Sequence, residues 1–198
     1  MWFGIFRIIV LILLKIYFRL KVEGVKNLPK KTNFIVVANH VSFLDPLLIT
    51  AAIPKKIYWI TMRSVYNVFG LRWIMKLAKA LPSGNSSEKA LGLLIKNKSV
   101  GLFPEGTRTY DGKLGEFRRG AALLAIKTGR PIAPCAILGV YEAFPRTAKF
   151  PKFLPIKVKI GKPIYLLKES SDEVIDDIFL QDGIFKVKNT IKEMIYAG

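Results

Sequence analysis

The sequence predicts an α/β fold: a single domain with a mixed, largely parallel sheet flanked by helices, plus an N-terminal membrane-associated helix. The chain has 198 residues, which is the size of one domain. From residue 17 onward, short β-rich runs alternate with stretches of helical spacing. The first twenty residues are mostly apolar. We therefore expect an interfacial membrane-anchoring helix over 1–20 and the folded domain over 21–198.

The N-terminal stretch MWFGIFRIIVLILLKIYFRL predicts a helix that lies in the membrane interface. Arg7 and Lys15 bound its longest apolar run, and burying such charges at mid-membrane costs about 2.5 to 3.5 kcal/mol each. On a helical wheel Arg7, Lys15 and Arg19 share one face, which can meet anionic head groups. No small-residue cleavage site follows, which argues against a signal peptide. A core helix with charges at its rim is the alternative.

Six runs predict strands and four predict helices. The strands are YFRLKVEG (17–24), NFIVVAN (33–39), KIYWITM (56–62), SVGLFP (99–104), PIAPCAILG (131–139) and IKVKIGKPIYL (156–166). The helices lie near 42–53, 64–79, 86–97 and 117–129. NFIVVAN and SVGLFP are nearly continuous in apolar residues, so we expect both to be fully buried. Both end in polar motifs, and ligands of α/β sheets gather beyond the carboxyl ends of strands.

The composition pairs high apolar content with a strong positive charge. Hydrophobic residues make up 51% of the chain and the formal net charge is +18, which indicates a partner that is both apolar and anionic. Residues 1–167 hold 28 basic against 7 acidic side chains, whereas residues 168–198 hold 4 against 7 and predict a solvated helical cap. Nucleic acid is disfavoured because the aromatic residues gather in apolar runs.

Cysteine usage and the missing motifs exclude several classes of protein. Cys135 is the sole cysteine, so there is no disulfide framework, and a reducing cytoplasmic compartment fits best. Its apolar neighbours predict an inert core residue. The chain has no GxxxxGK[ST], GxGxxG or GxSxG motif, so nucleotide-driven chemistry and the serine-hydrolase elbow lose support.

The only histidine of the chain lies in NHVSFLD, residues 39–45. We expect Ser42 to be the N-cap of a helix whose first turn contains Asp45. His40 would then lie outside the helix, where the Asp45 carboxylate can reach back to its ring, fix its tautomer and stabilise the imidazolium. Asn39 could hold the neighbouring backbone or a substrate. A capping Asp45 with a hydrogen-bonded core His40 is an equal alternative, and one histidine is too few for a multi-histidine metal site.

A second polar motif, FPEGTRT (103–109), follows the other buried strand. Its Pro and Gly predict a turn that presents Glu105, Thr107 and Arg108 at the sheet edge. Backbone N–H groups, a hydroxyl and a guanidinium suit a phosphate, although an ordinary turn with a Glu–Arg pair fits as well. The next predicted helix, FRRGAALLAIKTGRP (117–131), carries basic residues in its first turn, where they oppose the helix dipole. Those residues, Arg118 and Arg119, hint at an anionic ligand.

Taken together, NHVSFLD, FPEGTR about sixty residues later, FRRGA and RPIAPCAILG resemble the glycerolipid acyltransferase family, particularly the 1-acylglycerol-3-phosphate (lysophosphatidate) acyltransferases. The resemblance covers about residues 30–140. It implies that the domain 21–198 is an acyltransferase domain that makes phosphatidate in phospholipid biosynthesis.

The resemblance also implies roles for residues. His40 would be the general base for the sn-2 hydroxyl of the acceptor, with Asp45 as its orienting partner. The glycerol phosphate would be bound by Asn39, Glu105, Gly106, Thr107 and Arg108, with Arg118 or Arg119 adding charge. The donor would be acyl-CoA or acyl-carrier protein, with no metal and no other cofactor. The implied partners are both substrates and the anionic surface of the membrane, at whose cytoplasmic face the protein would be monotopic.

One departure from the family leaves the acceptor open. Many members carry an arginine in a motif between the two above, and LAKALPSGNSSEK (77–89) has none. Lys79, Arg63 or Arg72 are candidate substitutes. Other lysophospholipids or glycerol 3-phosphate are alternative acceptors. A thioesterase that uses His40 and Asp45 to activate water is a second enzymatic hypothesis, and a basic membrane-surface binding protein is the non-enzymatic one.

Overall fold

The strands of the computed structural model, which describes residues 2–61, 81–82, 86–166 and 177–196, form one mixed sheet. The strand order is β1-β7-β6-β2-β5-β3-β4, and all neighbours are parallel except β6 and β7. Their bounds are β1 Lys21–Glu23, β2 Ile35–Ala38, β3 Ile57–Thr61, β4 Leu81–Pro82, β5 Ser99–Leu102, β6 Ile132–Leu138 and β7 Lys157–Ile160. The predicted mixed, largely parallel sheet is confirmed.

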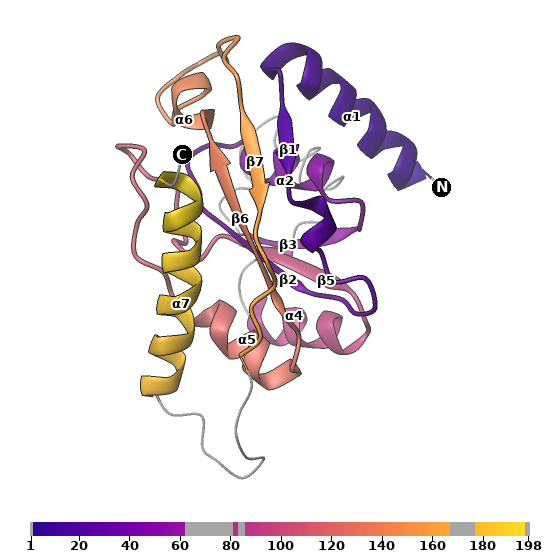
Figure 1. Cartoon of the computed structure of the whole chain (residues 1–198), viewed down its shortest axis with the longest axis vertical. Coiled ribbons are helices and arrows are strands. Elements are labelled where there is room, and N and C mark those ends of the chain that lie inside the picture. The colour runs from indigo at the N-terminus through magenta and orange to yellow at the C-terminus, as the bar shows by residue number, and fades with distance from the viewer. Residues whose placement is uncertain (1, 62–80, 83–85, 167–176, 197–198) are drawn as a thin grey trace.

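Helices cover both faces of this sheet, with α7 along one side and α1 and α2 on the other (Figure 1). The helices are α1 Trp2–Phe18, α2 Asp45–Ala52, α4 Ser86–Ile95, α5 Gly120–Thr128, α6 Val140–Ala143 and α7 Asp177–Tyr196, with a 3-10 turn η1 at Val25–Asn27. α4 and α5 share the face of α7. The fold is therefore a helix–sheet–helix sandwich.

The central strand β2 shows why its sequence has no polar position. Val36 and Ala38 pack into the cluster beneath α1 and α2, whereas Ile35 and Val37 pack into the cluster beneath α4, α5 and α7. Successive side chains of a strand point to opposite faces, so a strand covered on both faces must be apolar throughout. The predicted burial is confirmed for NFIVVAN and for residues 99–102 of SVGLFP, since every residue of β2 and β5 is buried, whereas Phe103 is half-buried.

Some predicted element boundaries are wrong or untested. Tyr17 and Phe18 belong to α1 and not to a strand, because Phe18 completes the buried face of the helix. The short α6 and β4 were not predicted, and the helix predicted near 64–79 lies outside the described residues. Cys135 is fully buried on β6, and this burial raises the pKa of its thiol to about 12. Its predicted place in the core is confirmed.

The helix α1 is amphipathic, but in a different sense from the predicted one. Leu14 and Phe18 are buried, and Arg7 lies on the same face, where its Nη1 donates a hydrogen bond to the Ala51 carbonyl at 2.9 Å. Arg7 is therefore not part of a free basic face. The opposite face is an apolar stripe of half-exposed or more exposed side chains, namely Ile5, Ile8, Ile9, Ile12, Leu13 and Ile16. Within the described residues, no helix combines the length and apolarity that a membrane crossing needs.

Candidate active site

The predicted contact between His40 and Asp45 is confirmed. His40 directly follows Asn39 after the end of β2, and Asp45 is the first residue of α2, so the carboxylate can reach Nδ1 of the imidazole. His40 Nδ1 is 2.8 Å from Asp45 Oδ2, and the exposed fractions of the two side chains are 18% and 0%. If Nδ1 carries the proton that this carboxylate accepts, Nε2 is left with a lone pair. Nε2 of His40 can therefore accept a proton from a bound hydroxyl.

Asp45 also holds the turn that precedes α2, where Ser42 was predicted to be the N-cap. Its Oδ2 accepts hydrogen bonds from the backbone N–H groups of Val41 and Ser42, at 2.7 and 2.8 Å. The N-cap residue is Leu44, and the Ser42 hydroxyl accepts only a weak bond of 3.3 Å from the Leu44 N–H. The prediction of Ser42 as N-cap is wrong because the helix begins two residues later, and Asp45 itself holds the preceding turn.

Glu105 holds the backbone on which the histidine sits. It is buried, its Oε1 accepts a hydrogen bond from the His40 N–H at 2.7 Å, and its Oε2 accepts one from the Gly115 N–H at 3.0 Å. Burial raises the pKa of its carboxyl group, while the two backbone hydrogen bonds and His40 act in the opposite direction. Its contacts make Glu105 a brace between the two motifs, and its predicted binding of substrate stays a prediction.

The chain after β5 also binds the backbone carbonyl of His40. The Thr109 N–H donates a hydrogen bond to the His40 carbonyl at 3.0 Å. The two motifs, 39–45 and 103–109, therefore meet at the carboxyl edge of the sheet, because β2 and β5 are parallel neighbours. This shared edge is what the sequence predicted.

Two aromatic rings stack behind the imidazole. The ring of Phe103 lies parallel to that of His40, with centroids 4.1 Å apart, and the buried Trp59 stacks on Phe103 with centroids 4.8 Å apart. Trp59 is fixed in turn, since its Nε1 donates a hydrogen bond to Thr50 Oγ1 at 3.0 Å. Gly101 makes room for this indole, because a Cβ there would lie 2.8 Å from Trp59 Cε3. The stack restrains the plane of the imidazole.

Arg108 supplies positive charge next to the pair. Its Cζ lies 3.4 Å from the ring centroid of Phe43, inside the NHVSFLD motif. Burial and the nearby Arg146 lower the pKa of its guanidinium, which stays charged in proteins. Arg146 itself lies over the exposed Tyr110, with Cζ 4.3 Å from the ring centroid. Neither arginine forms an ion pair within the described part of the chain, so an anion is electrostatically favoured here.

The other predicted binding residues divide into two groups. Gly106 adopts a left-handed backbone conformation, with φ 74°. The Arg118 side chain packs directly against it, since a Cβ at Gly106 would lie 2.9 Å from Arg118 Cζ. Thr107 is exposed on the same turn. Asn39 and Arg119 have other partners. Asn39 exchanges two hydrogen bonds with the backbone of Ile137 on β6, and Arg119 pairs with Asp177 of α7.

Sequence reasoning missed Phe43, Phe103, Gly115 and Arg146. Phe103 is the last apolar residue before the PEG turn, and Arg146 is a basic residue in the connection that follows β6, so both positions carried a signal. Gly115 carried none, since its N–H meets Glu105 only through the path of the loop. The candidate substitutes for the missing middle-motif arginine, Arg63, Arg72 and Lys79, lie outside the described residues.

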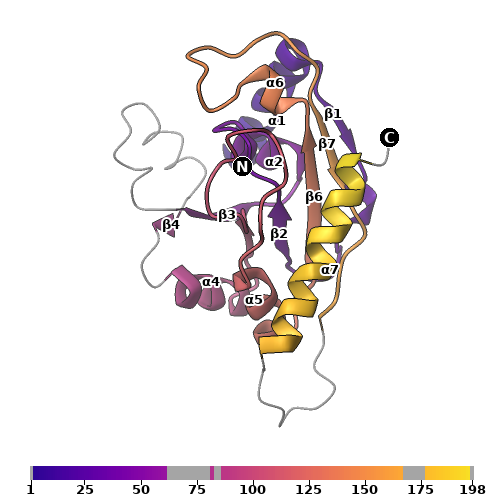
Figure 2. The same cartoon turned by 90° about the vertical axis from the view of Figure 1, so that its left-hand side faces the viewer.

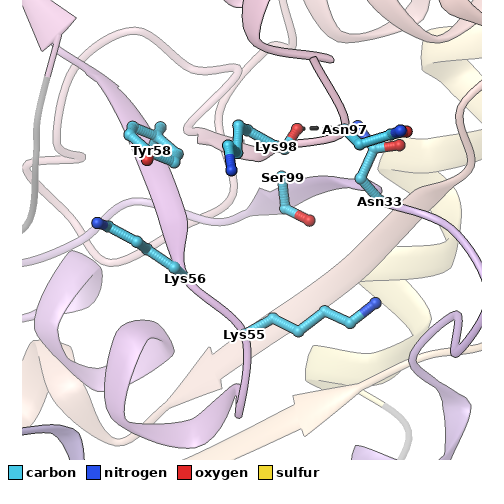
Figure 3. Close-up of a pocket in the computed structure, with 7 residues that line it drawn as sticks. All are labelled: Asn33, Lys55, Lys56, Tyr58, Asn97, Lys98 and Ser99. Carbon is cyan, nitrogen blue, oxygen red and sulfur yellow. Dashed lines mark hydrogen bonds between the residues drawn. The ribbon is translucent and has the colours of Figure 1, made fainter. Parts of the chain in front are cut away.

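A lysine-lined pocket of about 300 Å³ lies elsewhere, at the amino ends of β3 and β5 (Figure 3). It is lined by Asn33, Lys55, Lys56, Tyr58, Asn97, Lys98 and Ser99. Lys55 already donates to the carbonyls of Pro29 and Thr32. Because β2, β3 and β5 run parallel, this pocket and His40 lie at opposite edges of the sheet.

Comparison with known proteins places these motifs in one family. The family model described as acyltransferase matches residues 19–138, which is more than half of the chain. The chloroplastic 1-acyl-sn-glycerol-3-phosphate acyltransferase of Brassica napus is 30% identical over 75% of this chain and 46% of its own length. The 1-acyl-sn-glycerol-3-phosphate acyltransferase of Borreliella burgdorferi is 28% identical over 86% of this chain and 72% of its own length.

A solved structure matches the fold. The crystal structure of the 1-acyl-sn-glycerophosphate acyltransferase PlsC from Thermotoga maritima has a TM-score of 0.71 and 26% sequence identity, covering 95% of this chain and 80% of that one. The chain spans less than half the length of the chloroplastic relatives that it matches.

Proposed function

This chain belongs to the acyltransferase family, and on that premise we propose that it moves a fatty acyl chain from an acyl thioester to the sn-2 hydroxyl of 1-acylglycerol 3-phosphate, giving phosphatidate. The observation that carries the proposal is the 2.8 Å contact between His40 Nδ1 and Asp45 Oδ2, beside a turn that presents Arg108. A poised base next to a site for an anion is what a lysophosphatidate acceptor requires.

In the proposed mechanism His40 works as the general base. Its Nε2 takes the proton of the sn-2 hydroxyl while the oxygen attacks the carbonyl carbon of the thioester. The tetrahedral intermediate collapses by breaking the C–S bond, and the leaving thiolate takes the proton back from the imidazolium. Asp45 holds Nδ1–H and stabilises the imidazolium between these two steps. The chemistry written here uses no metal and no cofactor beyond the acyl donor.

Arg108 and Arg146 are the proposed receptors of the acceptor phosphate. Arg108 is held by its stacking on Phe43, so its N–H groups are directed by the same motif that holds the base. Arg118 lies against Gly106 on that turn and adds a third guanidinium. Arg119 is not included in this proposal, because Asp177 already neutralises it. In this proposal Arg146 supplies the positive charge that many family members obtain from the middle-motif arginine, which this sequence lacks.

We place the protein at the cytoplasmic face of the cell membrane as a monotopic protein. The apolar stripe of α1 supports contact with acyl chains, and the net charge of +18 supports attraction to an anionic leaflet. The same charge favours acidic donors, and both acyl-CoA and acyl-carrier protein are acidic. Lysophosphatidate would reach the site from the surface to which the protein is bound.

The test is an assay of the purified full chain with lysophosphatidate, other lysophospholipids and glycerol 3-phosphate, each offered with acyl-CoA and with acyl-carrier protein. We expect phosphatidate from lysophosphatidate, and we expect His40→Ala to abolish nearly all of it without loss of vesicle binding. Free fatty acid without phosphatidate would instead support the thioesterase hypothesis. Full turnover by His40→Ala would overturn the mechanism.

A further inference from the structure

The connection between α6 and β7 exposes two phenylalanines in the middle of a basic segment. Phe150 is 81% exposed and Phe153 is 73% exposed, which is unusual for side chains of this size. Residues 144–155 contain Arg146, Lys149 and Lys152 and no acidic residue. Aromatic side chains flanked by lysines suit the boundary between lipid head groups and acyl chains.

This connection is fastened to α1. The ring of Phe153 stacks on that of Tyr17 with centroids 3.8 Å apart, and the Tyr17 hydroxyl donates a hydrogen bond to the Pro151 carbonyl at 2.9 Å. The backbone continues the contact, since the Ile156 N–H donates to the Phe18 carbonyl at 3.0 Å. Both views place the connection at the end of the molecule where α1 meets β1 (Figures 1 and 2). It therefore adjoins the helix that carries the apolar stripe.

The same connection also reaches the active site. It follows α6, which begins just after β6, and because β6 is parallel to β2 the carboxyl end of β6 lies at the edge of the sheet where His40 lies. Near its beginning, Arg146 lies over the ring of Tyr110, and just before it, on α6, the Tyr141 hydroxyl donates a hydrogen bond to the Tyr110 carbonyl at 2.7 Å. Tyr110 is two residues beyond Arg108. The segment thus joins the site at one end to α1 at the other.

We propose that residues 149–154 form a second membrane-contacting element, which inserts Phe150 and Phe153 into an anionic lipid surface beside the stripe of α1. The charge of the segment selects this occupant. A second copy of the chain would bring its own lysines against these lysines, because a twofold interface pairs a surface with itself. Anionic head groups complement the lysines, and acyl chains complement the rings.

The test uses an environment-sensitive thiol label. Cys135 is fully buried, and its thiol pKa is raised to about 12, so it does not compete for the label. Phe150→Cys reports the loop, Ile16→Cys reports α1, and Phe185→Cys is the matched control on α7, where Phe185 is 63% exposed. Each full-length labelled protein is mixed with vesicles of phosphatidylglycerol and phosphatidylcholine, and with vesicles of phosphatidylcholine alone.

We expect the emission of the Phe150 label to shift to the blue with the anionic vesicles and that of the Phe185 label to stay unchanged. The inference rests on the proposed membrane association of α1. The Ile16 label tests membrane contact by α1 separately from membrane contact by the loop. A shift at Ile16 without one at Phe150 overturns the loop inference alone, and a shift at neither site overturns both. A shift at Phe150 that grows with protein concentration in the absence of vesicles would assign the surface to a second copy and overturn the inference as well.

A vesicle-partition measurement shows how much the two phenylalanines contribute to membrane binding. The double variant Phe150→Ser, Phe153→Ser should bind anionic vesicles at least about tenfold more weakly in a sedimentation assay, because each ring loses its apolar burial. Phe185→Ser should bind like the unaltered protein. Equal binding by the double variant and the control would overturn the inference. Because this assay measures partition and not turnover, it is independent of the reaction that His40 catalyses.

Discussion

Replacing Glu105 by Gln tests whether this residue positions the base or binds the substrate. The carboxylate now accepts two hydrogen bonds, one from the His40 N–H at 2.7 Å and one from the Gly115 N–H at 3.0 Å. A glutamine amide has one oxygen and one NH₂ group, so only one of these donors can keep an acceptor. The other N–H must face a second donor. Shape and size are preserved, so the change removes little except this hydrogen bond and the charge.

The expected cost follows from that count. Leaving one buried donor unsatisfied costs about 1 to 3 kcal/mol, which a domain with a stability of about 5 to 15 kcal/mol can tolerate. We therefore expect a folded protein in which the His40 backbone or the loop at Gly115 shifts. Misplacement of a catalytic group by about 1 Å lowers rates on the order of 100-fold. We expect kcat to fall about 10- to 100-fold and KM for lysophosphatidate to change by less than about threefold.

Steady-state kinetics with lysophosphatidate and a saturating acyl donor measure both constants, and urea unfolding measures the stability. The matched control is Glu116→Gln, whose parent side chain is 93% exposed and pairs with Lys188 at the surface. Such a pair contributes about 0 to 1 kcal/mol, so this variant should behave like the unaltered protein. A large rise in KM with kcat unchanged would refute the reasoning, because Glu105 would then contact the acceptor directly.

Three further predictions concern the same site. His40 is the only histidine, so its ring protons are directly assignable by NMR. Phe103→Leu should move these resonances downfield, because the imidazole loses the ring-current shielding of the stacked phenyl ring, and unchanged resonances would contradict the stack. Arg108→Lys should raise KM for lysophosphatidate about 10- to 100-fold through loss of a charge-assisted hydrogen bond, whereas Arg119→Lys should leave KM unchanged; equal effects would contradict the assignment. Burial raises the pKa of Glu105 above its ordinary 4.5, so the folded protein holds this proton more tightly than the unfolded chain. The unfolding free energy of the protein, taken relative to that of Glu105→Gln, should therefore fall as the pH rises from 4.5 to the pKa of Glu105 in the folded state. A difference that grows with pH over this range would contradict the prediction.

The spacing within NHVSFLD was enough to predict the contact between His40 and Asp45, because a histidine just before a helix lies within reach of a carboxylate in its first turn. The same local reasoning failed for Ser42, since it could not show that Asp45 would itself bind the two preceding N–H groups. The role of Glu105 was out of reach for another reason. Its second partner, Gly115, is ten residues away along an irregular loop, and no periodicity encodes the path of such a loop.

The fold shows the same division between local and long-range information. Continuous apolar runs predicted the buried strands, and their parallel order brought the two motifs to one edge of the sheet. The ring stack behind His40 was not predicted, because its members come from separate strands and their connections. The protein-facing side of α1 was also not predicted, since a helical wheel groups Arg7 with Lys15 but does not say which face meets α2.

The arrangement of the site, the 149–154 loop and α1 has an energetic reason if the acceptor is a lysolipid. Withdrawing a sixteen-carbon chain from a bilayer into water costs on the order of 12 kcal/mol at about 0.8 kcal/mol per CH₂, so the hydroxyl must reach His40 Nε2 while the chain stays in an apolar environment. A single interfacial helix fixes the height of the protein but leaves it free to roll about the helix axis. A second contact, joined to Tyr17 across 134 positions of sequence, removes that rotation. The edge of the sheet that carries His40 would then stay turned toward the lipid surface.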